Sequence, residues 1–321
     1  MEGLQVVWGW QPALYLFLGG MGAGAFVAAM IVYFREGEKC RGTAVVSVLA
    51  AVVCLVVGLL LLLSELITPL RGMMMWQSFS NFTSWMTFGA WIVFAAVVVF
   101  VLVAVCMGKR SSALVSKVWK GFEGLAPKLA RILGVVGVAL GLCVAAYTGI
   151  LLMSAPGVPL WNTPLLPCLF TVSALDTGVA LVEVVAFVFR KKEDMGEGTA
   201  KILEIAVVAL VVLELAALAL LLTSMLGEAD TAVAAAAAQS ASILVEGQLA
   251  PFFWGLVVAV GLALPLVAAV LAFVLKSKKA GVTSLVGAIG AMVGGCALRF
   301  IIILAGLHAD PVMGAVAVLL G

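Results

Sequence analysis

Long apolar runs constrain this chain more than any other feature. A helix that spans a bilayer needs about 20 predominantly apolar residues. Eight segments reach that length, approximately residues 12–34, 43–67, 85–107, 132–154, 166–189, 202–226, 251–275 and 282–306. Only 11% of the 321 residues are charged and the mean hydropathy is +1.27, whereas a soluble domain carries roughly 25% charged residues. We therefore predict an all-α membrane protein with eight transmembrane helices. The composition excludes a soluble enzyme and a nucleic-acid-binding domain.

The basic residues predict how these helices are oriented. All of the 18 lysines and arginines except Arg71 and Arg299 follow the first, third, fifth or seventh segment. Loops rich in lysine and arginine remain in the cytoplasm, so we expect both termini to be extracytoplasmic. The first ten residues lack a basic region, which favours a retained first helix over a cleaved signal peptide.

The predicted outer side is rich in tryptophan and proline. Six of the eight tryptophans lie there, at positions 8, 10, 76, 85, 161 and 254. They could form an interfacial belt or a docking surface for an extracytoplasmic subunit. A belt would normally occupy both sides, so this asymmetry favours docking. Residues 227–247 are acidic and include an alanine run, Ala234–Ala238, which predicts a short helix outside the membrane.

Residues that bind metals are scarce. The six cysteines are scattered without a CxxC pair, and His308 is the one histidine. This pattern argues against an iron–sulfur cluster or zinc site, and it excludes a haem held by two histidines of this chain. We predict no metal and no haem here, so electrons would reside on a bound small molecule or on another subunit.

Ionisable residues within the apolar segments are candidates for function, because a charge in hydrocarbon is costly. Arg299 lies in the eighth segment, and four acids lie in the fifth and sixth: Asp176, Glu183, Glu204 and Glu214. The helical rise of about 1.5 Å per residue places these acids at depths from the cytoplasmic side to the midplane. They could pack as protonated donors beside Arg299, or they could form a proton path from the cytoplasm.

Small residues and two tyrosines complete the candidate features. Glycines spaced for close helix contact occur at Gly20 and Gly24 and at Gly290 and Gly294. This spacing favours close packing of helices. The alternative is that these glycines form the wall of a pocket. Tyr15, beside Gln11, and Tyr147 lie near the outer ends of the first and fourth segments. A tyrosine hydroxyl at that depth needs a partner, so each could belong to the interfacial belt or donate to a ligand carbonyl.

Four stretches resemble the NrfD/PsrC family of polysulfide-reductase-type integral membrane subunits. They are WGWQPALYLFLGGMGAGAF (residues 8–26), ELITPLRGMMMWQSFSNFTSWMTFGAW (65–91), YTGILLMSAPGVPLWNTPLLPCLFTVSALDTG (147–178), and the pair FWGLVVAVGLALPL and LRFIIILAGLH near the end. They occur in family order across nearly the whole sequence.

The resemblance implies eight helices in two four-helix bundles, here residues 1–154 and 155–321, the second with an extracytoplasmic loop at 227–250. It implies a quinone or quinol, menaquinone or ubiquinone, bound near the outer face. It also implies an extracytoplasmic iron–sulfur subunit with several clusters, often attached to a molybdopterin-dependent catalytic subunit. The setting would be a respiratory complex in a bacterial or archaeal cytoplasmic membrane, with surrounding lipid.

The resemblance also suggests which residues contact the quinone. Tyr147 matches a tyrosine that binds the quinone in relatives, and Glu65 matches an acid before a Pro-x-Arg step. Tyr15 and Pro12 stand where relatives place histidine and asparagine, so Gln11 is a substitute hydrogen-bonding neighbour. Trp10 completes the expected quinone-binding set.

Two other functions are compatible with the residues. An ion- or proton-translocating transporter would use the buried acids and Arg299, although transporters usually contain paired broken helices, which we do not find in the sequence. A purely structural anchor would bind no quinone.

Overall fold

The computed structural model describes residues 8–64, 85–155, 157–193, 195–226, 231–275 and 280–309. Within these ranges the protein forms helices and no β-strand, which confirms the all-α prediction. Seven helical stretches there are long and apolar enough to cross a membrane: Trp10–Ser64, Trp85–Met107, Phe122–Met153, Leu165–Phe189, Glu197–Met225, Ala250–Ala272 and Gly281–Leu304. The first stretch contains two helices joined by a 3₁₀ turn, so eight crossings remain a prediction.

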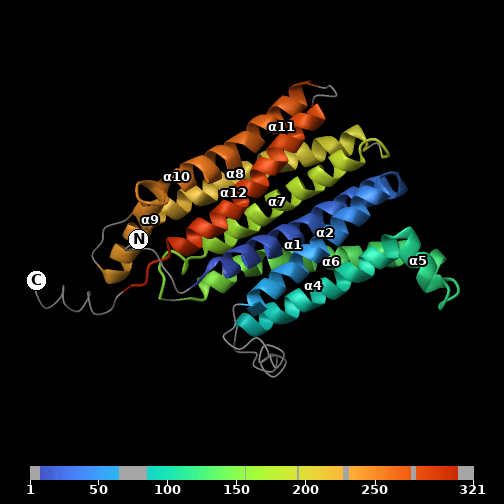
Figure 1. The fold of residues 1–321 in the computed structure, drawn as a ribbon, viewed down its shortest axis with the longest axis horizontal. Coiled ribbons are helices and arrows are strands. Elements are labelled where there is room, and N and C mark those ends of the chain that lie inside the picture. The colour runs from blue at the N-terminus through green and yellow to red at the C-terminus, as the bar shows by residue number, and fades with distance from the viewer. Residues whose placement is uncertain are drawn as a thin grey trace, which may run out of the picture.

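The long helices lie side by side along one direction (Figure 1). Their bounds are α1 Trp10–Glu36, α2 Arg41–Ser64, α4 Trp85–Met107, α6 Phe122–Met153, α7 Leu165–Phe189, α8 Glu197–Met225, α11 Leu264–Leu275 and α12 Ala280–Leu304. Helices α1, α2, α4 and α6 form one closed ring of contacts, and α7, α8, α11 and α12 form another. The most extensive contact between the two rings joins α1 to α7.

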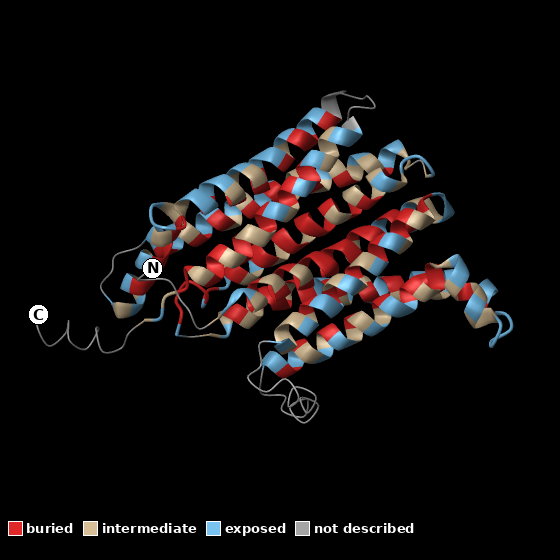
Figure 2. Ribbon diagram, in the orientation of Figure 1, coloured by how far each residue is buried: buried red, intermediate tan, exposed pale blue. Residues whose placement is uncertain are grey.

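Buried residues concentrate along α1 and α7, whereas the outer helices expose apolar side chains (Figure 2). Leu60 of α2, Phe94 of α4 and Ile205 of α8 are each 59% exposed. Such a surface is stable only in an apolar solvent, as expected for helices that face lipid.

Glycines bring α1 and α7 into backbone contact. A Cβ added to Gly24 would overlap the carbonyl of Ala174, and one added to Gly178 would overlap the backbone of Gly24. Small residues allow this approach, and close packing replaces the hydrophobic force that is absent between helices in lipid. These contacts agree with the packing interpretation of the glycine spacing.

The two ends of the helix array differ. One end, here called the basic end, carries α5 (Lys109–Ser116) and the turns at residues 37–40 and 190–193. The opposite end carries α9 (Ala232–Val245) and the residues 157–164 (Figure 1). The helix α9 falls within the alanine-rich segment, as predicted.

At the basic end, a carboxylate ties the two rings together. Glu193, after α7, accepts hydrogen bonds from the backbone N–H groups of Gly42 and Thr43 at 2.6 and 2.8 Å, and from the Thr43 hydroxyl at 2.8 Å. The first N–H groups of a helix have no partner within it, so Glu193 satisfies two of those of α2.

The predicted span 251–275 contains an irregularity that its apolar pattern does not predict. It begins with α10 (Ala250–Phe252), continues as a π-helix over Phe253–Ala263 and ends as α11. Pro265 follows the π-helix, and a proline ring clashes with the carbonyl four residues earlier in a regular α-helix. The wider π-helical turns relieve that clash. The π-helix also brings Gly261 against Gly294 of α12.

Candidate functional site

A cavity of about 460 Å³ lies between α1, α2, α4 and α6, near the end of the helix array that carries α9. We call it the tyrosine cavity. Most of its wall is apolar and includes Leu16, Leu59, Leu62, Val93 and Leu151. Three residues with hydroxyl groups also line it, Tyr15, Tyr147 and Ser154. The volume is within the range of small-molecule sites, which are typically apolar with a few oriented polar groups.

The two tyrosines of this cavity are buried near each other. Tyr15 is 5% exposed and Tyr147 is 6% exposed, and their hydroxyls are close enough to interact electrostatically. Among the described residues, neither hydroxyl hydrogen-bonds to a protein group. A buried tyrosine hydroxyl usually finds a partner, so both are available to donate to a ligand in the cavity.

A glycine on α4 makes room for one of these tyrosines. A Cβ added to Gly89 would overlap the ring and hydroxyl of Tyr147. Any other residue at this position would therefore displace the Tyr147 ring or separate α4 from α6. The cavity thus combines an apolar space with hydroxyl donors held in place by helix packing, which suits a flat, apolar ring with carbonyl acceptors.

A second polar group of residues is buried where α7, α8 and α12 meet. Asp176, Glu214 and Arg299 are 1%, 3% and 0% exposed. The Arg299 guanidinium donates through Nη1 to the Ser173 hydroxyl and, at 3.0 Å, to the Gly295 carbonyl. The Glu214 side chain lies near Ser173. We call Ser173, Asp176, Glu214 and Arg299 the buried polar centre.

The charged groups of the buried polar centre interact without forming close ion pairs. No ion pair within 4 Å joins Arg299 to an acid in the described part of the protein, but its charge interacts with those of Glu214 and Asp176. One carboxylate oxygen of Asp176 and the Nε of Arg299 are buried without a hydrogen-bond partner among the described residues. Burying an uncompensated charge costs several kcal/mol, so this arrangement requires a reason.

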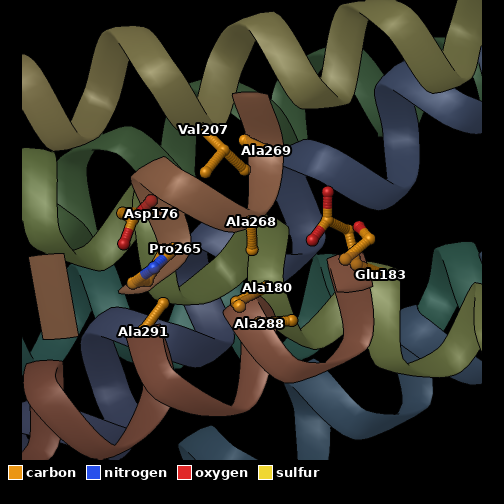
Figure 3. Close-up of a pocket in the computed structure, with 11 residues that line it drawn as sticks. Asp176, Ala180, Glu183, Val207, Pro265, Ala268, Ala269, Ala288 and Ala291 are labelled. Carbon is orange, nitrogen blue, oxygen red and sulfur yellow. The ribbon is translucent and has the colours of Figure 1, made fainter. Parts of the chain in front are cut away.

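Two further cavities extend from the buried polar centre toward the basic end. The first has a volume of about 10 Å³ and lies between Asp176 and Glu183 (Figure 3). The second has a volume of about 420 Å³ and is lined by Glu183, Arg190, Glu193 and Glu204. Glu183 and Ser284 line both cavities.

Comparison with known proteins agrees with this architecture. The family described as Polysulphide reductase, NrfD, matches residues 2–309. The protein belongs to this family. It is 33% identical to the C subunit of the polysulfide reductase of Wolinella succinogenes over 312 residues, which covers 94% of each of the two proteins. It is 27% identical to protein NrfD of Escherichia coli over 209 residues, which covers 59% of the present protein and 62% of the Escherichia coli one.

Family membership and the long apolar helices identify a multi-pass membrane protein. Within this NrfD-family member, the structure brings Tyr15 and Tyr147 to one cavity. Gln11 and Trp10 do not line that cavity, and Trp10 is 56% exposed beside a smaller space between α1 and α12. Glu65 lies outside the described residues.

The five residues of the predicted proton path also have defined places. Asp176, Glu214 and Arg299 belong to the buried polar centre, whereas Glu183 and Glu204 are partly buried nearer the basic end. No group of three or more metal-ligating residues occurs in the described ranges. The quinone and proton roles of these residues remain predictions.

Several residues of both sites were not among the residues predicted from the sequence. Trp8, Gly89 and Ser154 line or shape the tyrosine cavity, Ser173 lies near Glu214, and Ser284 lines a cavity together with Glu183. Gly89 and Ser154 occur within the motifs that resemble the NrfD/PsrC family, so those motifs were the available signal. Ser173 also lies within one of these motifs, whereas Ser284 on α12 carries no signal in the sequence beyond its polarity.

Proposed function

We propose that this protein is the quinone-reactive membrane subunit of a respiratory oxidoreductase complex. The cavity with Tyr15 and Tyr147 would bind a quinone or quinol, either menaquinone or ubiquinone. The observation that carries this proposal is the pair of buried tyrosines that line an apolar cavity of about 460 Å³ and whose hydroxyls have no hydrogen bond to the described residues. The similarity to the C subunit of polysulfide reductase, a protein named as one component of a reductase, supports it further.

The bound quinone would supply the redox chemistry, since its oxidation or reduction moves two electrons and two protons. The protein would orient the ring through the Tyr147 and Tyr15 hydroxyls, each donating to a carbonyl oxygen. The apolar wall would keep water from the ring. Because this subunit is proposed to hold no metal and no haem, the electrons would pass to or from a partner.

The proposed partner is an iron–sulfur subunit with several clusters on the extracytoplasmic face, attached to a catalytic subunit that would be molybdopterin-dependent. The cavity lies at the end that we expect to face outward, which supports electron exchange there. We also propose that α1 and α2 cross the membrane separately. This gives eight crossings in two groups of four, residues 1–154 and 155–321, with the closed rings of contacts in support.

The alternative is ion or proton translocation without quinone chemistry. The buried polar centre favours some proton or ion role, but the tyrosine cavity would then have no use. Quinone binding by the purified protein decides between these functions.

The test compares two buried tyrosines. Tyr147→Phe removes one neutral hydrogen bond, worth about 0.5–1.5 kcal/mol, so affinity for a short-chain quinone analogue should fall about two- to tenfold. Tyr33, 5% exposed in the basic half of α1, lies outside the cavity, and Tyr33→Phe should bind normally. Quenching of tryptophan fluorescence by the quinone measures both. Equal affinity in wild type and Tyr147→Phe would remove Tyr147 from the site.

A further inference from the structure

The short helix α5 and the turn after it form a surface that the proposed quinone site does not use. In Figure 1, α5 does not continue along the long helices but projects to the side at the basic end. Its inner side packs against the protein, since Ser112 is 6% exposed and Val115 contacts the apolar core. The Ser111 hydroxyl also donates to the Val105 carbonyl at 2.9 Å. These contacts determine which side of α5 faces outward.

The outward side of α5 combines basic and apolar side chains. Positions 110, 114, 117 and 118 lie on one face of the helix, because they are spaced by about whole helical turns. Leu114, Val118 and Trp119 are 62%, 92% and 56% exposed. We call the exposed residues of this segment the α5 surface: Arg110, Leu114, Lys117, Val118, Trp119 and Lys120.

The basic residues of the α5 surface have no acidic partner in the described part of the protein. Elsewhere at the basic end, Arg41 forms an ion pair with Glu38 at 2.7 Å. No such pair within 4 Å involves a basic residue of the α5 surface and any described residue. Residues 109–131 contain six basic residues and one acid, Glu123, a net charge of +5. The segment therefore presents positive charge that the protein does not compensate.

Retention of lysine and arginine in the cytoplasm explains this charge, but it does not explain the apolar side chains exposed among the basic ones. An exposed apolar patch with a polar rim is typical of a surface that binds a protein or a membrane. The α5 surface therefore requires a partner that is both negatively charged and apolar.

The position of α5 indicates which partner this is. The helix begins two residues after the last residue of α4, whose outer side chains such as Leu102 are exposed as expected for contact with lipid. It therefore starts at the boundary of the hydrocarbon region and runs along that boundary. Tryptophan is enriched at the level of the lipid headgroups, and helices with a basic and an apolar face bind anionic lipids there. A soluble acidic protein would neutralise the charge without requiring a helix at this boundary.

We propose that the α5 surface binds anionic phospholipids. Its basic side chains donate to the lipid phosphate groups, and its apolar side chains insert below the headgroups. This function goes beyond the proposed quinone function, because the α5 surface and the tyrosine cavity lie at different ends of the helix array.

The test measures contact between Trp119 and lipid in nanodiscs that contain the purified protein. Bromine atoms on an acyl chain near the headgroup quench the fluorescence of a tryptophan that they contact. The signal of Trp119 is the difference between the wild type and Trp119→Phe. Brominated phosphatidylglycerol, which is anionic, is compared with brominated phosphatidylcholine, which has no net charge, each in a background of phosphatidylcholine. The ratio of the two quenching efficiencies measures the preference for the anionic lipid.

In the wild type, phosphatidylglycerol should occupy the α5 surface at least about tenfold more strongly than phosphatidylcholine, because several basic residues attract it together. The triple variant Arg110→Gln, Lys117→Gln, Lys120→Gln should reduce this preference to less than about twofold. The apolar side chains are unchanged in this variant, so quenching by phosphatidylcholine should persist.

The matched control removes the same amount of charge from the second ring at the same end. It carries Lys191→Gln, Lys192→Gln and Lys201→Gln, all at exposed positions, and it should keep the wild-type preference. If the triple variant of the α5 surface does not fold, the wild type is measured in about 1 M salt, where the screening length falls to roughly 3 Å. The preference should then be lost.

Three results would overturn the proposal. The first is equal quenching by the two lipids in the wild type. The second is an unchanged preference in the folded triple variant or in high salt. The third is a Trp119 signal that neither lipid quenches, because the surface would then lie outside the bilayer and face a soluble partner.

This readout needs neither quinone nor a partner subunit. Failure here would leave the proposed quinone function intact, and a loss of quinone binding would leave the lipid result intact.

Discussion

At the scale of single residues, the tyrosine cavity depends on a hydroxyl donor and on a missing side chain. Tyr147 supplies the hydroxyl, and Gly89 supplies the space that the Tyr147 ring occupies. Protein interiors are close-packed, so even one added methyl group is felt by its neighbours. The position of the Tyr147 ring should therefore depend on Gly89. The proposed quinone binding should depend on Gly89 as well.

We predict that Gly89→Ala weakens quinone binding at least as much as Tyr147→Phe, by about two- to tenfold, because the added Cβ displaces the tyrosine ring. The control is Gly124→Ala on α6, where an added Cβ meets no atom within 4 Å. Titration of both variants with a quinone analogue measures the effect. Normal affinity in Gly89→Ala would show that the ring position is unimportant.

The sequence predicts some of these residues and not others. Tyr15 and Tyr147 are recognisable because tyrosine is rare in this protein and both lie near the ends of apolar runs. Gly89 is one of 34 glycines, and its role depends on which residue of α6 lies opposite. That pairing joins helices that are distant in sequence, and helical periodicity alone does not specify it.

At the scale of helices, the contact between α1 and α7 holds the two rings together. Here the backbones meet at Gly24 and Gly178. We predict that Gly178→Val lowers the free energy of unfolding by roughly 1–3 kcal/mol, the usual cost of overpacking. Gly124→Val, on an open face of α6, serves as the control. Thermal unfolding in detergent should separate the variants, and equal midpoints would contradict a tight α1–α7 contact.

Helix positions follow from the apolar runs, but helix details do not. The run at 85–107 matches α4 at both ends, whereas α6 begins ten residues before the predicted 132, at Phe122. Residues 122–131 are polar enough to lie outside a membrane yet continue the helix, and an apolar-length criterion omits them. The π-helix at Phe253–Ala263 was also unpredictable, because π-helical and α-helical residues have the same apolar composition.

At the scale of the whole molecule, the two candidate sites open at different ends. The tyrosine cavity lies near the end with α9, and the cavity of about 420 Å³ that Glu183 and Glu204 line lies toward the basic end. If the basic end faces the cytoplasm, the proposed quinone site lies near the outer face. The orientation of the protein in the membrane is therefore central to its energetics.

The distribution of basic residues predicts that orientation. A reporter active only in the cytoplasm should be inactive when fused after Gly321 and active when fused after Lys120. Activity after Gly321, with none after Lys120, would invert the molecule and place the tyrosine cavity at the cytoplasmic face.

The central claim is that the tyrosine cavity binds the quinone, and photochemical labelling tests it most directly. A rival apolar groove of about 630 Å³ lies between α8 and α11, lined by residues such as Val208 and Val270. A photoreactive quinone should label peptides that contain residues 85–93 and 147–155, and an unlabelled quinone should compete. Labelling confined to α8 and α11, with none at α4 or α6, would contradict the account.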